Sequence, residues 1–219
     1  VQALPKVRDG AEEPFLLILG GSKVSDKIAV IENFLDKASS IMIGGAMAYT
    51  FMKAKGIPVG KSRVEEDKVA LAKDFIKRFD ARDKEFILPI DHVVVSSFDN
   101  LKEYSTTDDE NIPADKLAVD IGPKTRELFA CHIKDSKTVF WNGPMGVYET
   151  PPFNEGSFAI AKAMAESSAM TVIGGGDSAA AAVDSGYAKD MTHISTGGGA
   201  SLEFMEGQTL PGLAILRKK

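Results

Sequence analysis

Residues 171–181 read "TVIGGGDSAAA". A short apolar run leads directly into three glycines, and an Asp, a Ser and a row of small residues follow. The stretch is typical of a strand, a tight turn and a helix. Glycine in an ordered element costs about 0.5–1 kcal/mol relative to alanine. Three glycines in a row therefore indicate that this turn needs bare backbone.

The same pattern occurs four times. It is written "LILGGSK" at 17–23, "IMIGGAM" at 41–47, "VIGGGDS" at 172–178 and "ISTGGGAS" at 194–201. In open parallel sheets, ligands bind outside the carboxyl ends of the strands. Four such turns on one edge would line a crevice with uncovered N–H groups and helix N-termini, which suits anions and above all phosphates. The alternative is that the glycines only make tight turns. This would account for a single turn of this kind, but it accounts less well for four of them.

The remaining sequence alternates apolar runs with amphipathic stretches, which predicts an α/β fold: a three-layer, Rossmann-like open parallel sheet with helices on both faces. We expect one domain over 1–219, and we interpret 100–115 as an irregular surface excursion. The expected strands are 15–19, 41–43, 86–88, 92–96, 117–121, 138–141, 170–173 and 191–195, and the expected helices include 25–37, 65–79, 123–134 and 153–168.

Composition excludes several classes of protein. The net charge is −5, with 26 Lys+Arg against 31 Asp+Glu and no basic block, which argues against nucleic acid or an anionic membrane as partner. No apolar run is long enough to span a bilayer. The single cysteine, Cys131, lies in a helical pattern and is predicted to be a buried structural thiol in a reducing, cytoplasmic compartment. The three histidines lie far apart in sequence, so no metal site built from protein ligands alone is expected.

Charged residues beside the glycine turns are the candidates for chemistry. Lys23 and Lys27 lie one helical turn apart after the first turn, where ammonium groups suit phosphate oxygens. Asp177 follows three glycines and is interpreted as an ordinary N-cap, as a ligand of the Mg²⁺ that accompanies phosphates, or as both. Asn142 and Glu149, in "VFWNGPMGVYE" (139–149), are candidates for ribose or base contacts, and Trp141 is expected in the core.

Two nucleotide motifs are absent. "GIPVGKS" at 56–62 resembles a P-loop, but it is one residue too short between its glycines and follows a helical pattern rather than a strand. No GxGxxG turn occurs, which weakens the case for a nucleotide-linked dehydrogenase. A nucleotide-sensing or assembly module on the same fold remains a second alternative, because fold does not determine function.

Taken in order, "GGSKVSDKI", "IGGAMAYTF", "VDIGPKT", "FWNGPMGVYE", "GGGDSAAA" and "STGGGASLEF" resemble the C-terminal, nucleotide-binding domain of phosphoglycerate kinase over residues 15–212. The resemblance implies a nucleotide site with Mg²⁺ on Asp177 and with Lys27 and the fourth glycine run, at 197–199, serving the transferred phosphoryl group. The residues that it implies are Gly20, Gly21, Gly44, Gly45, Ala118, Val119 and Val147 around the adenine; Asn142 and Glu149 at the ribose; Lys23, Lys27, Gly175, Gly176, Asp177 and Ser178 at the phosphates; and Gly197, Gly198 and Gly199 at the phosphoryl group in transfer.

Four positions depart from the family pattern. Ala118 and Val119 stand where Gly-Leu is common, Ser178 replaces a common Thr, and Arg63 stands where an apolar residue is usual. None of these changes removes a charged catalytic group.

The family activity implied is the reversible, glycolytic transfer of a phosphoryl group from 1,3-bisphosphoglycerate to ADP, which gives 3-phosphoglycerate and ATP. The family's phosphoglycerate site lies on an N-terminal domain with no counterpart here. We therefore expect a monomeric chain that binds Mg·ADP or Mg·ATP but is inactive alone. Residues 1–14 would be the connection to that domain and 208–219 the returning tail, both loose in isolation.

Overall fold

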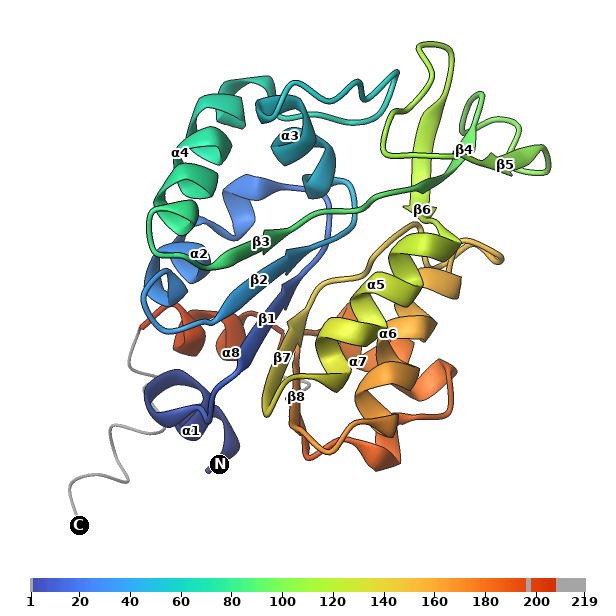
Figure 1. Cartoon of the computed structure of the whole chain (residues 1–219). Coiled ribbons are helices and arrows are strands. Elements are labelled where there is room, and N and C mark those ends of the chain that lie inside the picture. Colours follow the sequence, from blue (N-terminus) through green and yellow to red (C-terminus); the bar gives the residue numbers. More distant parts are fainter. Residues whose placement is uncertain (1, 196–197, 208–219) are drawn as a thin grey trace.

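The computed structural model describes residues 2–195 and 198–207, and within them a six-stranded sheet has the order β3-β2-β1-β7-β8-β9 (Figure 1). All neighbouring strands of this sheet pair in parallel. The chain builds outward from β1 to β3 and then returns to the other side of β1, which places the topological switch point between β1 and β7. The strands are β1 (Phe15–Leu19), β2 (Ser40–Ile43), β3 (Glu85–Ile87), β7 (Thr138–Asn142), β8 (Met170–Gly174) and β9 (His193–Ser195).

Helices cover both faces of this sheet, as predicted (Figure 1). Side chains alternate along β1: Leu17 packs into one hydrophobic cluster with α2, α3, α4 and α8, whereas Leu16 packs into another with α5, α6 and α7. Two apolar clusters on opposite faces make a three-layer α/β fold. The helices of the first face are α2 (Ile28–Phe34), α3 (Met47–Ala54), α4 (Val69–Asp80) and α8 (Gly198–Met205), and those of the second are α5 (Pro123–Lys134), α6 (Glu155–Glu166) and α7 (Gly176–Asp184).

A second sheet corrects the prediction for the middle of the chain. The strands expected at 92–96 and 117–121 do not join the parallel sheet: β4 (His92–Val95) and β6 (Leu117–Ile121) pair antiparallel with each other, and β5 (Tyr104–Thr106) completes a three-stranded sheet. The stretch 100–115, predicted to be irregular, thus contains a strand. Every residue of β6 is buried, so its continuous apolar pattern imitates that of a parallel-sheet strand.

The N-terminal segment is also more ordered than expected. Residues 3–10 form α1 (Ala3–Gly10), where Val7 is buried and the Arg8 guanidinium lies 4.2 Å from the centre of the Phe204 ring on α8. The expectation of a loose segment at 1–14 is therefore wrong for this helix, since its apolar side chains pack against α8. The predicted tail at 208–219 lies outside the described residues.

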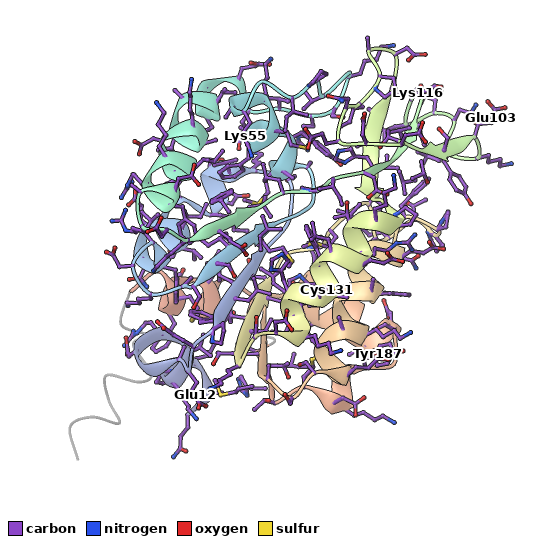
Figure 2. All side chains as sticks on the ribbon, in the orientation of Figure 1. Glu12, Lys55, Glu103, Lys116, Cys131 and Tyr187 are labelled. Carbon is purple, nitrogen blue, oxygen red and sulfur yellow. The ribbon has the colours of Figure 1, made fainter. Side chains whose placement is uncertain are left out.

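The prediction of a buried Cys131 is wrong as well. Cys131 is exposed on α5, where Figure 2 labels it. Thr125, Phe129 and Ile133 form the buried face of this helix at a spacing of four residues, which leaves Cys131 on the opposite side. Among the described residues, no helix is long and apolar enough to cross a membrane.

Candidate functional site

Two connected cavities lie at the carboxyl edge of the parallel sheet and share Gly21, Ser22, Pro144 and Asp177 in their walls. One, here called the apolar chamber, has a volume of about 270 Å³ and is lined by side chains such as Tyr49, Phe98, Leu117, Ala118, Val119 and Val147. The other, the lysine chamber, has a volume of about 290 Å³ and is lined by Lys23, Lys27, Asn142, Ser178 and the turn before α7. The crevice is thus elongated, with one apolar and one cationic end.

The first two glycine turns interlock with the turn after β7. The Gly20 amide donates to the Asn142 carbonyl at 2.9 Å, and the Gly21 amide donates to the Pro144 carbonyl at 2.9 Å. Likewise, the Gly44 amide donates to the Leu19 carbonyl and the Gly45 amide donates to the Met145 carbonyl. The prediction that these turns leave their N–H groups uncovered is therefore wrong, because backbone carbonyls of neighbouring strands and of the turn after β7 accept from these donors.

Close packing explains why glycine stands in these turns. A Cβ atom on Gly20 would lie 2.2 Å from the Pro144 carbonyl oxygen, and one on Gly44 would lie 2.2 Å from the Met145 sulfur. Real Cβ atoms do not approach other atoms so closely. The alternative of tight turns thus accounts for these two glycines, which shape the crevice walls.

The segment before α7 forms the strand, glycine turn and helix start that the sequence predicts. Gly175 has a φ of +100°, which bends the chain so that α7 begins at Gly176. The first N–H groups of a helix have no partner within the helix, and here Gly176, Asp177 and Ser178 line the lysine chamber. No atom lies within 4 Å of a Cβ built on Gly176. This turn therefore offers backbone donors and open space to an anion.

Asp177 is not the N-cap of α7, since Gly175 occupies that position. Asp177 lies in the first helical turn, is exposed, and contributes to the walls of both chambers. No group of three or more acidic, His or Cys side chains capable of holding a metal occurs in the described part of the chain. Asp177 still fits Mg²⁺, because this ion often takes one or two carboxylates and completes its shell with phosphates and waters.

Lys27 is half-buried at the switch point, between β1 and α2. Its ammonium group donates to the side-chain oxygen of Asn142, whose amide nitrogen donates to the Gly174 carbonyl at 2.6 Å. Burial lowers the pKa of Lys27, and the carboxylates of Asp26, Glu206 and Asp177 partly oppose this. The pair of lysines predicted at this turn lies in one chamber, and Lys23 is exposed at its edge.

Ser178 connects two of the turns. Its hydroxyl oxygen is buried and accepts a hydrogen bond from the Gly143 amide at 2.6 Å. This bond holds the turn after β7 against the first turn of α7. The predicted hydroxyl thus lies in the chamber wall, where it also organises the backbone.

The apolar chamber brings together residues from distant parts of the chain. Ala118 and Val119 come from β6, and the Val147 amide donates to the Val119 carbonyl at 2.8 Å. Glu149 is exposed at the chamber wall. Trp141 is fully buried, as predicted.

Sequence reasoning missed two aromatic residues of this chamber. Tyr49 is buried on α3, and burial raises its pKa. Phe98 is 61% exposed, although it is a large apolar side chain. Tyr49 lies within the quoted stretch 43–51, but neither aromatic side chain carries a local signal for a binding site, and the two reach the chamber from separate parts of the chain.

The fourth glycine run, at 197–199, lies only partly within the described residues. Gly197 lies outside the described residues, Gly198 begins α8, and Gly199 lines the lysine chamber. Thus each of the four glycine turns contributes a described residue to the crevice: those after β1, β2 and β8 do so directly, and the fourth does so through Gly199 of α8.

The fold and this crevice define a class: a doubly wound α/β protein with a crevice at the topological switch point, the place where such folds bind ligands, that has one cationic and one apolar end. Comparison with known proteins specifies the family. The model of the phosphoglycerate kinase family matches residues 1–208. The chain therefore belongs to the phosphoglycerate kinase family, as the sequence motifs indicated.

Individual relatives support this family assignment. The chain is 58% identical over 205 residues to a phosphoglycerate kinase of Clostridium botulinum (strain Alaska E43 / Type E3), covering 94% of this chain and 52% of the relative. It is 50% identical over 219 residues to that of Bdellovibrio bacteriovorus, covering 100% of this chain and 55% of the relative. The structure of phosphoglycerate kinase from Coxiella burnetii matches with a TM-score of 0.92 and 35% identity, over 99% of this chain and 56% of the other. The chain thus spans about half the length of these relatives.

Proposed function

We propose that this chain is the nucleotide-binding half of a phosphoglycerate kinase, and that its crevice holds Mg·ADP or Mg·ATP. The observation that carries the proposal is the pairing of an apolar chamber with a chamber that contains Lys23, Lys27 and the start of α7. A nucleotide has the same polarity, with a flat, largely apolar base at one end and phosphates at the other.

The phosphates belong in the lysine chamber. Lysine ammonium groups and the first-turn amides of a helix are both suited to phosphate oxygens. The base then lies between Val119 on β6 and the turn after β7, where Val147 and Pro144 line the other chamber. The span shared by both chambers, at Gly21 and Asp177, takes the ribose and the first phosphate.

The proposed reaction needs positioning and charge neutralisation more than covalent work by the protein. An oxygen of the ADP β-phosphate forms a bond to the phosphorus of the acyl phosphate, and the bond from that phosphorus to the acyl oxygen breaks. Asn142 holds the Lys27 ammonium in the chamber, and the α7 amides orient the phosphate chain. Mg²⁺, held by Asp177 and phosphate oxygens, would neutralise further charge when bound. The acceptor is already ionised, so no general base is required.

The phosphoglycerate substrate requires a different surface. A multiply charged acyl phosphate calls for clustered arginines. In the described part of the chain, Arg8, Arg78, Arg82 and Arg126 are each ion-paired outside the two chambers. We therefore propose that 1,3-bisphosphoglycerate binds to the other half of the full-length protein.

Calorimetric titration with Mg·ADP tests nucleotide binding, and a coupled assay on the purified chain tests turnover. We expect saturable, magnesium-dependent binding without appreciable phosphoryl transfer. Absence of nucleotide binding by the folded chain would contradict the proposal. Turnover in the ordinary kinase range of about 1–100 s⁻¹ would contradict the expectation that this chain is only half of the enzyme.

A further inference from the structure

Glu65 ties the segment that carries both lysines of the site to a distant part of the chain. Its carboxylate accepts two hydrogen bonds from Ser25, one from the amide at 3.2 Å and one from the hydroxyl at 2.7 Å. Ser25 lies at the centre of η1 (Val24–Asp26). This single 3₁₀ turn separates Lys23 from Lys27. The first N–H groups of a helical segment have no partner within it, so a carboxylate is well suited to this position.

Glu65 itself is held by the scaffold. Its amide donates to the hydroxyl of the buried Thr50 on α3 at 3.1 Å, and its carbonyl accepts from the Lys68 amide at 2.9 Å. Earlier in the same loop, the Ser62 hydroxyl accepts a hydrogen bond from the Ala118 amide of β6 at 2.9 Å. The loop that bears Glu65 is thus fixed to α3 and β6, and its carboxylate can in turn fix η1.

The two lysines differ in how much they depend on this contact. The Lys27 ammonium group has a partner of its own, the side-chain oxygen of Asn142. Lys23 is exposed, and within the described ranges 2–195 and 198–207 no ion pair or side-chain hydrogen bond holds its ammonium group. The direction of the Lys23 side chain therefore depends on the backbone of η1, which is held by the buried Val24 side chain and by the Glu65 carboxylate.

We infer that Glu65 is a positioning residue, which fixes η1 so that the Lys23 ammonium group reaches the phosphates of a bound nucleotide. Glu65 lines neither chamber, so it acts through Lys23 rather than on the ligand. Removal of a carboxylate from the surroundings of a phosphate site would, by charge alone, strengthen the binding of an anion. Loss of a positioning contact weakens that binding instead, so the sign of the effect distinguishes the two roles. The inference rests on the proposed nucleotide site.

Calorimetric titration with Mg·ADP measures this effect in Glu65→Ala, with Glu66→Ala as the matched control. Both substitutions remove one negative charge from the same part of the chain, but the Glu66 carboxylate pairs with Lys53 at 2.6 Å and has no bond to η1 in the described structure. We expect Glu65→Ala to weaken Mg·ADP binding by about 3- to 10-fold, as for partial loss of one charged contact, and Glu66→Ala to change it by less than about 2-fold. Unchanged or tighter binding in Glu65→Ala would overturn the inference.

A double-mutant cycle separates positioning from a general loss of structure. Lys23→Met and the double variant Lys23→Met/Glu65→Ala should bind Mg·ADP equally, because Glu65 has no role once the ammonium group is gone. Glu65→Gln keeps an acceptor oxygen for the Ser25 hydroxyl, so it should retain most of the affinity that Glu65→Ala loses. Independent, multiplying losses for Glu65→Ala and Lys23→Met, or no loss in Lys23→Met, would overturn the inference and leave the proposed function standing.

Ser25→Ala tests the same contact from its other side, at an exposed position. We expect it to weaken Mg·ADP binding by about 2- to 5-fold, a smaller loss than in Glu65→Ala, because the amide bond to the carboxylate remains. This variant decides the question even if Glu65→Ala does not fold, since unchanged or tighter binding in Ser25→Ala would also contradict the inference. Failure of the unmutated chain to bind Mg·ADP would overturn both this inference and the proposed function.

Discussion

Lys27 and Asn142, which are 115 residues apart in sequence, share a hydrogen bond at the switch point of the sheet. The bond joins the segment after β1 to the last residue of β7, and Asn142 is oriented by its second bond to the Gly174 carbonyl. The interaction therefore links three neighbouring strands, β1, β7 and β8, at the floor of the crevice. Its consequences for stability and binding can be measured.

A double-mutant cycle between Lys27→Met and Asn142→Ala should show coupling in the free energy of unfolding. Hydrogen bonds to charged groups contribute about 1.5–3 kcal/mol, so we expect a coupling energy of about 1 kcal/mol or more from urea denaturation. Lys23→Met provides the matched control, because Lys23 is exposed and has no bond to Asn142 in the described structure. Equal coupling for both lysines would show that Asn142 does not hold Lys27 specifically.

Asp177→Asn should weaken binding of Mg·ADP by about 10-fold or more and change binding of metal-free ADP little, since its proposed contact is with the ion. Calorimetry with and without magnesium measures both affinities. Glu149→Gln is a suitable comparison, because this carboxylate lines only the apolar chamber and should affect both forms alike. If Asp177→Asn weakens both forms equally, Asp177 is not the magnesium ligand.

Gly20→Ala and Gly176→Ala should have opposite effects on stability. At Gly20 the new methyl group would meet the Pro144 carbonyl, so we expect a loss of about 1–3 kcal/mol in the free energy of unfolding. At Gly176 the methyl group meets no atom within 4 Å in a helical turn, so stability should stay the same or rise by about 0.4–1 kcal/mol. Gly176→Ala should nevertheless weaken Mg·ADP binding, because the methyl group enters the lysine chamber. Denaturation and calorimetry together distinguish these outcomes.

The buried side chain of His92 should make the free energy of unfolding depend on pH. Its side chain is fully buried, Nε2 donates to the Glu110 carbonyl at 3.1 Å, and burial lowers the pKa of His92 to about 4. An unfolded histidine has a pKa of about 6.5, so the unfolded chain binds one more proton between these values. His92 therefore costs no stability above about pH 6.5, and stability falls as the pH decreases from there toward 4.

The size of this effect is about 1.4 kcal/mol in the free energy of unfolding for each pH unit in that window. Urea denaturation between pH 4.5 and 7.5, with His92→Gln as the comparison, isolates it from other groups. Asp120 acts in the opposite direction, since burial raises its pKa to about 8 and its contribution to stability falls as the pH increases toward that value. An unchanged slope in His92→Gln would contradict the assignment to His92.

The sequence by itself was sufficient to locate the six strands of the parallel sheet and the glycine turns that line the crevice. Strands such as β1 and β7 are continuous apolar runs, and glycines follow them at once, so their type and the position of the crevice can be recognised locally. The family motifs can be recognised locally for the same reason, because each is a short segment at the end of a strand. Lys23, Lys27 and Asp177 were found by their place beside these turns.

Only the tertiary structure decided how these segments meet. It showed that the amides of Gly20 and Gly45 donate to neighbouring backbone carbonyls rather than face open space, and that β4 and β6 form a separate antiparallel sheet. It also brought Phe98 and Arg63 to one chamber and left Cys131 exposed. Apolar periodicity reports whether a residue is buried, but not which distant segment buries it. That choice depends on strand pairing and loop packing between residues far apart in the chain, and no local pattern encodes it.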